Sequence, residues 1–194
     1  MTVDPNLFAS LAKNYVGGIA VPHPGQEGYR AQVDSSGLNL EYKQALRVVA
    51  LGHSYLATPS GSPIDLTQND WSALDGTYAL GTLCDSRFTL AASGGGLIWG
   101  GSESIVAVCC STVTIDPASA NNTYAFRYAV DGTPTGDHTH TTPSVVGDTS
   151  APLVQPVAVA PGETLSIVVT NHTDNDDVSI EHVTLMVLAL AAAT

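Results

Sequence analysis

The strongest constraint on this fold is the last third of the chain, where apolar residues alternate with polar ones and then run together. From Asn122 to Leu190, strand-like segments are separated by short polar turns. Alternation with a period of two is typical of strands with one buried face. The final segment, Val183–Leu190, is almost continuously apolar and therefore needs cover on both faces. A second sheet of the same chain can cover one face, and a second copy of the protein can cover the other.

Short apolar segments continue upstream and predict an all-β fold. Charged residues make up only 12% of the chain. Because parallel pairs need long crossover connections, the short turns favour antiparallel pairing. We therefore predict an antiparallel jelly-roll sandwich over residues 46–194, preceded by an N-terminal arm over residues 1–45. The expected strands are Ala45–Leu51, Thr77–Leu83, Arg87–Ala91, Leu97–Trp99, Ser104–Ile115, Tyr124–Val130, Leu153–Val159, Leu165–Val169 and Val178–Leu190, with a long polar loop over Gly132–Pro152.

The arm combines a short amphipathic segment with a stretch that cannot be regular. A short helix is predicted over residues 1–13, because Asp4 can cap it and Pro5 suits its first turn. Residues 16–37 contain five Gly and two Pro, so they are expected to be extended. The apolar residues expected to dock the arm onto another surface are Leu7, Phe8, Leu11 and Tyr15.

Charge is distributed unevenly between the arm and the body. Residues 1–47 carry four basic and four acidic side chains, whereas residues 48–194 carry two Arg against fourteen Asp and Glu. An acidic body repels nucleic acid and anionic membranes, so neither is an expected partner. No basic, apolar leader opens the chain, and no apolar run reaches the roughly 18 residues of a membrane span, so we expect neither. Cys84, Cys109 and Cys110 are interpreted as small buried apolar residues.

Two polar clusters contain residue types that bind metals. His138 and His140 are two apart, so in extended backbone both imidazoles share a face, and Asp137 can orient one of them. Asp174, Asp176 and Asp177 crowd one turn, as calcium ligands do. A polar surface loop explains the first cluster and ordinary turn chemistry the second, so no metal or cofactor is expected.

The sequence shows no arrangement typical of an enzyme. Ser54 follows His53 directly, but adjacent side chains on a strand diverge, and no nucleophile elbow surrounds Ser54. The acidic residues single out no catalytic pair. Trp71, Trp99 and the tyrosines fit core positions better than a sugar-stacking surface. We therefore expect no enzymatic activity.

The order of motifs over residues 88–190 resembles the jelly roll of tumour-necrosis-factor and complement globular-head proteins, in the form found on tailed-phage virions. Ser104-Ile105 stands where that family has Gly-x-Tyr, so the tyrosine is missing. Val130-Asp131-Gly132 matches the family's hairpin of any residue followed by Asn or Asp and then Gly, and Val159–Leu165 loosely matches its Leu-x-x-Gly-Asp-x-Ile motif, with Glu163 for Asp. Residues 1–75 have no counterpart in it.

The resemblance implies a homotrimer packed through the sheet that holds the last strand. It also implies roles in virion decoration, fibre tips or receptor binding. We therefore expect a structural virion protein, assembled in the host cytoplasm, that cements the capsid surface by binding the major capsid protein through its arm. The alternative is a receptor- or glycan-binding tip of a tail fibre or spike. The expected trimer interface comprises Val183, Leu185, Val187, Leu188 and Leu190.

Overall fold

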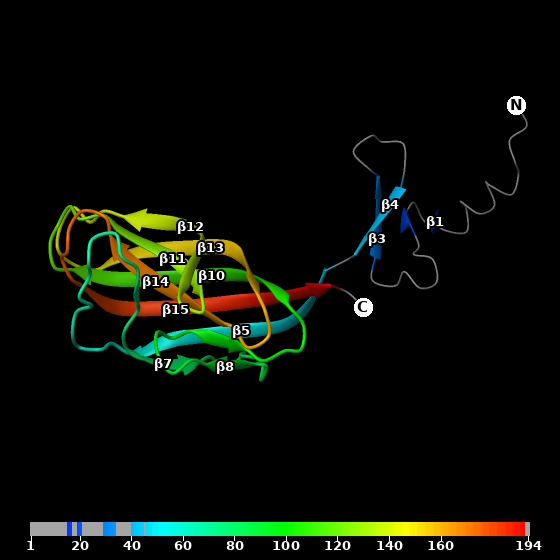
Figure 1. Cartoon of the computed structure of the whole chain (residues 1–194), viewed down its shortest axis with the longest axis horizontal. Helices are drawn as coiled ribbons and strands as arrows, with labels where there is room; N and C mark the ends of the chain where they lie inside the picture. Colours follow the sequence, from blue (N-terminus) through cyan, green and yellow to red (C-terminus); the bar gives the residue numbers. More distant parts are fainter. Residues whose placement is uncertain (1–14, 17–18, 21–28, 34–39, 45, 193–194) are drawn as a thin grey trace, which may run out of the picture. The chain divides into compact units, whose positions relative to one another are not determined.

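The computed structural model describes residues 15–16, 19–20, 29–33, 40–44 and 46–192, with side chains placed for residues 46–191. The chain divides into two compact units, Met1–Arg47 with Ala191–Thr194, and Val48–Leu190. Every regular element in the described ranges is a strand (Figure 1). These ranges therefore hold no helix that is long and apolar enough to cross a membrane.

The first unit contains two small antiparallel pairs. Strand β1 (Tyr15–Val16) pairs with β2 (Ile19–Ala20), and β3 (Tyr29–Val33) pairs with β4 (Leu40–Gln44). The Gly- and Pro-rich stretch predicted to be extended therefore includes backbone that pairs locally. The predicted helix over residues 1–13 lies outside the described residues, as do Leu7, Phe8 and Leu11 of the predicted docking segment.

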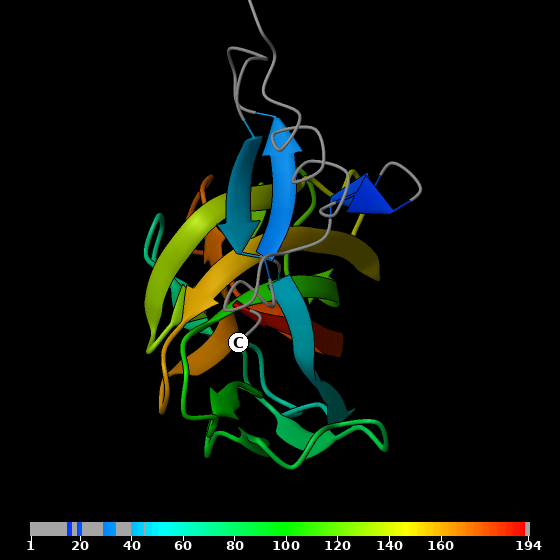
Figure 2. The ribbon, with the colours of Figure 1, turned by 90° about the vertical axis from the view of Figure 1, so that its right-hand side faces the viewer.

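The second unit is a sandwich of two antiparallel sheets, as predicted, and its strand order is consistent with a jelly roll (Figure 1). The five-stranded sheet has the order β13-β10-β15-β5-β7, and the six-stranded sheet has the order β12-β11-β14-β9-β8, with β6 paired to β14. Figure 2 views the strands more nearly end-on. Their bounds are β5 (Leu46–Thr58), β6 (Ser72–Ala73), β7 (Thr77–Leu80), β8 (Phe88–Leu90), β9 (Leu97–Trp99), β10 (Ile105–Pro117), β11 (Tyr124–Val130), β12 (Thr133–Thr141), β13 (Thr149–Val159), β14 (Thr164–Asn171) and β15 (Val178–Ala192).

The core lies between the sheets and is built from alternate residues of each strand. Tyr124, Phe126 and Tyr128 of β11 all point inward and are fully buried, as their spacing predicts. Tyr128 reaches the opposite sheet, where its Oη lies 2.8 Å from Ser111 Oγ and donates to the Leu153 carbonyl at 3.1 Å. These contacts join the two layers with a satisfied polar group in an otherwise apolar core.

The prediction of a long loop over Gly132–Pro152 is wrong. Most of this stretch forms β12 and the first residues of β13. The residues of β12 are polar on both faces, so their sequence lacks the alternation that marks a strand. The tight turn at Asp131-Gly132, with φ of 48° and 76°, instead returns the chain alongside β11. Pairing with β11, rather than local propensity, makes this segment a strand.

Strands β12 and β13 form neighbouring edges of the two sheets. Gln155 of β13 bridges them, because its Oε1 accepts from the Asp137 amide at 3.1 Å and its Nε2 donates to the Thr135 carbonyl at 3.4 Å. Both edge strands contain proline, at Pro134 in β12 and at Pro152 and Pro156 in β13. Proline lacks a backbone donor and is tolerated in sheets at edges.

Candidate functional site

The outward side of the five-stranded sheet carries an uncharged apolar surface, which we call the apolar face. It spans β5, β15, β10 and β13, and its most exposed members include Val154 at 70% and Met186 at 52%. Contiguous exposed apolar surface of this kind marks interaction sites. The outward residues that form it are Leu51, His53, Tyr55, Val106, Val108, Cys110, Thr112, Pro152, Val154, Pro156, Ala158, Thr184, Met186, Leu188 and Leu190.

Strand register arranges these residues in rows across the sheet. Cys110 lies opposite Met186 on one side and Val154 on the other. The next row places Val108 between Leu188 and Pro156. Residues directly opposite each other in antiparallel strands share a face, so each row is continuous across three strands. The apolar face contains no Asp, Glu, Lys or Arg, although the chain as a whole has a net charge of −12.

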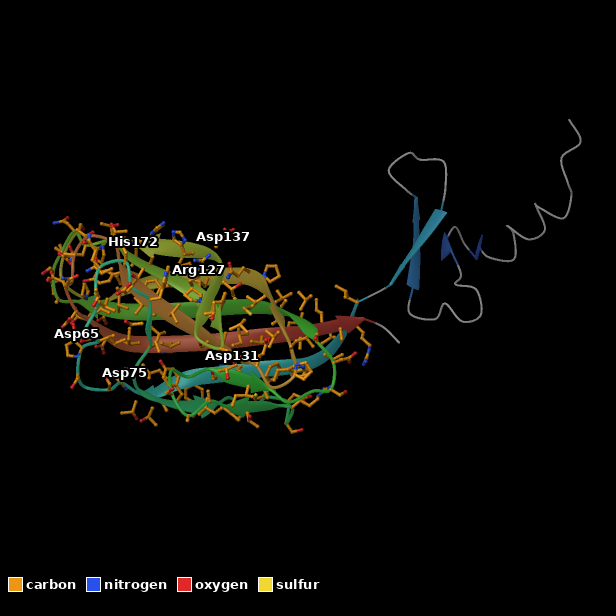
Figure 3. All side chains as sticks on the ribbon, in the orientation of Figure 1. Asp65, Asp75, Arg127, Asp131, Asp137 and His172 are labelled. Carbon is orange, nitrogen blue, oxygen red and sulfur yellow. The ribbon has the colours of Figure 1, made fainter. Side chains whose placement is uncertain are left out.

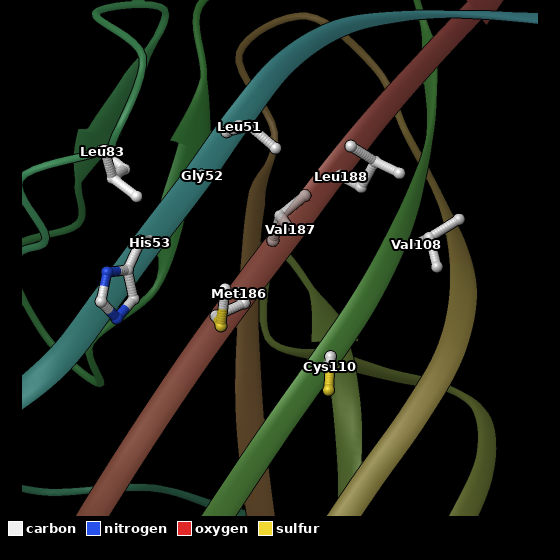
Figure 4. Close-up of a pocket in the computed structure, with 9 residues that line it drawn as sticks. All are labelled: Leu51, Gly52, His53, Leu83, Val108, Cys110, Met186, Val187 and Leu188. Carbon is white, nitrogen blue, oxygen red and sulfur yellow. The ribbon is translucent and has the colours of Figure 1, made fainter.

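A groove of about 240 Å³ crosses the apolar face where β5 meets β15 (Figure 4). Leu51 and His53 lie on the β5 side, and Met186 and Leu188 lie on β15. A Cβ added to Gly81 would lie 1.8 Å from His53 Nδ1, so only glycine at that position leaves room for the imidazole. Nearly all of the lining is apolar, so the groove suits apolar side chains rather than a polar ligand.

The structure separates the five predicted interface residues onto two faces. Val183, Leu185 and Val187 point into the core and are almost fully buried within their own sandwich. Leu188 and Leu190 point outward and belong to the apolar face, together with Met186 and Thr184, which were not predicted. The first three are therefore corrected to core residues, because the opposite sheet already covers them. In a continuous apolar run, the sequence does not show which alternate residues face the core and which face outward. The register of the strand in its sheet decides this.

The interpretation of all three cysteines as buried is also wrong. Cys109 is fully buried and points into the core, but Cys110 is exposed in the middle of the apolar face, and Cys84 is half-buried. Adjacent residues on a strand face opposite ways, so only one of the pair can lie in the core. Burial, and to a smaller extent the neighbouring Cys110, raises the pKa of the Cys109 thiol to about 12.

On the opposite side of the sandwich, the six-stranded sheet brings three histidines together. His138 and His140 of β12 share an outward face, as predicted, and their ring centroids are 4.4 Å apart. His172, which directly follows β14, joins them at 5.9 Å and 5.7 Å. His172 is distant in sequence from β12. Only the pairing of β12 and β14 with β11 indicates that His172 lies beside His138 and His140. Asp137 does not orient an imidazole through a described hydrogen bond, and its amide donates to Gln155 instead.

Aromatic and charged groups surround this histidine cluster. Trp71 contacts the rings of His138 and His172 edge-on, and the Arg127 guanidinium lies 5.9 Å from the Trp71 ring. Figure 3 labels Arg127, Asp137 and His172 of this region. Trp71 is thus part of this surface, whereas Trp99 is buried in the core against Phe88. Partial burial lowers the pKa of His138, and repulsion from His140, His172 and Arg127 lowers it further.

The remaining polar candidates take part in local structure. Asp174 Oδ1 accepts from the side-chain amides of Asn122 at 3.0 Å and Asn171 at 2.7 Å, and from the Asp176 amide at 2.9 Å. These contacts organise the turn as an Asx network. Ser54 is buried and donates to the Gly95 carbonyl at 2.8 Å, while His53 faces outward. The two side chains diverge as predicted and do not form a nucleophile–base pair.

No family model matches the chain, and no curated protein matches it. Among solved structures, it is similar to Eiger TNF from S. frugiperda, at 13% identity over 76% of this chain and 96% of that chain, with a TM-score of 0.48. It is also similar to PRD1 vertex protein P5, at 10% identity over 74% and 97% of the chains, with a TM-score of 0.43. At these levels the similarity is a distant one in strand arrangement.

Proposed function

We propose that this protein is a structural virion protein that forms a homotrimer through its apolar face and decorates a phage capsid through its N-terminal arm. Its function is mechanical attachment rather than catalysis. The observation that carries the proposal is an exposed, uncharged apolar face on an otherwise acidic body. The partner on that face is a second copy of the chain.

Charge supports self-association through this face. Two copies of an acidic body repel each other wherever carboxylates approach, but the apolar face brings no like charges together. Burying apolar area contributes roughly 25 cal/mol per Å², and a standard specific interface buries about 800 Å² on each partner. The outward rows cover four neighbouring strands, so a second copy can contact several rows at once. The proposal of three subunits, rather than another number, comes from the family that the sequence resembles.

The arm provides the attachment to the capsid in this proposal. Its charge is balanced, so it can approach a surface that the acidic body cannot, and its sequence offers Leu7, Phe8, Leu11 and Tyr15 as apolar anchors. Three arms on one trimer bind multivalently, which raises the overall affinity well above that of a single arm. The partner is the major capsid protein, whose repeated lattice presents several equivalent sites to one trimer.

Substitution on the apolar face tests the trimer. Met186→Glu places a carboxylate in the middle of the face, and we expect native mass spectrometry and sedimentation to change from trimer to monomer. Val145→Glu adds the same charge at an exposed residue in the loop between β12 and β13 and should leave the trimer intact. A wild-type protein that is monomeric at micromolar concentration contradicts the proposal.

Deleting residues 1–35 tests the role of the arm. We expect the shortened protein to keep its trimer but to lose binding to capsids that lack the protein, with no change in the adsorption of virions to cells. Circular dichroism checks that the sandwich remains folded. Retained capsid binding together with lost adsorption would instead identify a receptor-binding tip.

A further inference from the structure

We propose that His138, His140 and His172 bind one divalent transition-metal ion, with Zn²⁺ as the preferred ion. This site lies on the six-stranded sheet, and the proposal does not depend on the proposed trimer or on capsid attachment. It rests on three imidazoles that the fold brings together from two separate parts of the chain.

Register produces the convergence. Arg127 and Ala125 of β11 lie opposite His138 and His140 on one side, while Val168 and Thr170 of β14 lie opposite the same two residues on the other. His172 continues the outward series of β14, and its amide donates to the Thr123 carbonyl at 2.8 Å. The three imidazoles therefore project from the same side of the sheet, across β11.

The distances are close to those of a metal site. One ligand nitrogen from each of the three histidines lies within 4.8 Å of the other two. Zn–N bonds of about 2.0–2.1 Å in a tetrahedron require nitrogens roughly 3.3 Å apart. Because His138 and His140 are exposed, small rotations of their side chains bring the nitrogens to that separation without disturbing the core.

The donor set selects the class of ion. Imidazole nitrogens suit Zn²⁺, Ni²⁺, Cu²⁺ and Co²⁺, whereas Ca²⁺ and Mg²⁺ prefer oxygen ligands. A metal binds the neutral imidazole, so binding should weaken as the pH falls and the histidines take up protons. Three protein ligands leave the fourth position of a zinc tetrahedron open to water.

A neighbouring amide orients one ligand. Asn69 Oδ1 lies 2.8 Å from His172 Nδ1, and in the tautomer with a proton on Nδ1 it accepts that hydrogen bond. The lone pair of His172 is then on Nε2, the nitrogen free to bind the ion. Outer-sphere acceptors of this type fix the tautomer and ring orientation of metal-binding histidines. Asn69 holds a positive φ of 66°, so its backbone is set in a left-handed turn.

One nearby charge opposes the ion. Arg127 lies against Trp71 and repels a proton on His138, so it also disfavours a bound cation. Its Nε donates to the Gly136 carbonyl at 2.7 Å, which ties the guanidinium to the backbone of β12. Three metal–nitrogen bonds outweigh this single charge, which acts across partly exposed surface where water screens it.

A bound ion would join the edge strand β12 to the end of β14 across the intervening β11. In the described sandwich, β12 pairs along its length with β11 and is bridged to β13 by Gln155, so the ion adds a connection to β14. Zinc binding should therefore raise the midpoint of thermal unfolding of the whole sandwich, because the ion binds the folded state and not the dispersed ligands of the unfolded chain.

Titration of the untagged, chelator-treated full chain with ZnCl₂ tests the proposal. We expect calorimetry to give one ion per chain with a dissociation constant in the micromolar range or tighter. Each of His138→Asn, His140→Asn and His172→Asn should weaken binding at least about tenfold, the lower end of what even outer-shell changes cost. Cobalt should give the intense visible absorption of four-coordinate Co²⁺ rather than the weak bands of the hydrated ion.

Histidines elsewhere in the chain provide matched controls. His23→Asn, His53→Asn and His182→Asn should leave both the stoichiometry and the affinity unchanged. Asn69→Gly removes the acceptor but tolerates the positive φ, so it should weaken zinc binding about tenfold while the apo protein stays folded. Absence of saturable binding below millimolar zinc, or binding that His172→Asn leaves intact, overturns the proposal.

Discussion

The two outer faces of the sandwich differ in chemistry although they belong to the same fold. The apolar face of the five-stranded sheet is uncharged, and it lies open in the single chain. The outward side of the six-stranded sheet carries His138, His140 and His172, with the Trp71 ring edge-on to His138 and His172 and the Arg127 guanidinium over that ring. Both sheets bury their inner faces in the same way, so the difference lies in the outward residues. The core determines the fold, and the outward residues determine what each face can bind.

The largest expected effect comes from placing one charge on each face. Val108→Asp should raise the dissociation constant of the trimer at least about 100-fold, because an unpaired buried charge costs roughly 3–5 kcal/mol. Ser166→Asp puts the same charge on the outward side of the six-stranded sheet and should leave the trimer unchanged. Sedimentation equilibrium measures both variants. Equal dissociation in the two variants contradicts the distinction between the faces.

A change between the sheets should destabilise the fold while leaving both outer faces unchanged. Tyr128→Phe removes the hydroxyl that contacts Ser111 and Leu153, leaving buried polar groups without their partner. We expect the free energy of unfolding to fall by about 1–3 kcal/mol, measured by urea denaturation. Tyr55→Phe, on the apolar face, is the matched control and should change it much less. If Tyr128→Phe changed the dissociation constant of the trimer or the affinity for zinc, the outer faces would be coupled to the core.

The reactivity of Cys110 reports whether the apolar face is covered. In a Cys84→Ser background, a maleimide should modify Cys110 at least about tenfold more slowly in the trimer than in the Val108→Asp monomer, because the reagent cannot reach an interface thiol. Cys109 should stay unmodified in both, since burial raises its pKa to about 12. Mass spectrometry of timed samples measures the rates. Equal rates of Cys110 modification would place it outside the interface.

The smallest effect concerns protonation on the six-stranded sheet. In metal-free protein, His138 should titrate below its ordinary value of about 6.5, and His172→Asn should move that midpoint upward by removing a repelling neighbour. A pKa lowered in the folded state means that the unfolded chain takes up the proton first. The free energy of unfolding is therefore highest above the pKa of the unfolded chain. It falls as the pH drops from that value through the lower pKa of the folded state. NMR titration of the imidazole signals checks both statements, and a His138 midpoint at or above 6.5 contradicts them.

Sequence patterns predicted the strands whose residues alternate between a wet and a buried face. Strand β11 is predicted in this way, because Tyr124, Phe126 and Tyr128 share one side of a pleat, whereas most of the last strand is predicted from its continuous apolar run. Strand β12 was missed, because an edge strand with polar residues on both faces has no period to detect. Its only local signal is the Asp131-Gly132 turn, which returns the chain alongside β11 but does not determine how far the strand extends.

The candidate sites depended on register even more than the fold did. The apolar run of β15 was recognised, but the division between inward Leu185 and outward Leu188 needed the pairing with β10. His138 and His140 were found as a local pair, whereas His172 is more than thirty residues away. The sequence indicates only that His172 follows a predicted strand. It does not show that this strand, β14, pairs with the other side of β11. Residues that converge in this way are brought together by sheet topology, so their spacing in the sequence does not reveal them.

The prolines on the neighbouring edge strands restrict how the molecule can aggregate. Pro134 in β12 and Pro152 and Pro156 in β13 interrupt the row of backbone donors that an incoming strand would need. These edges are therefore poor templates for extending a sheet from one molecule into the next. Growth into fibrils through these edges is therefore disfavoured, which leaves side-chain surfaces such as the apolar face for contacts between copies.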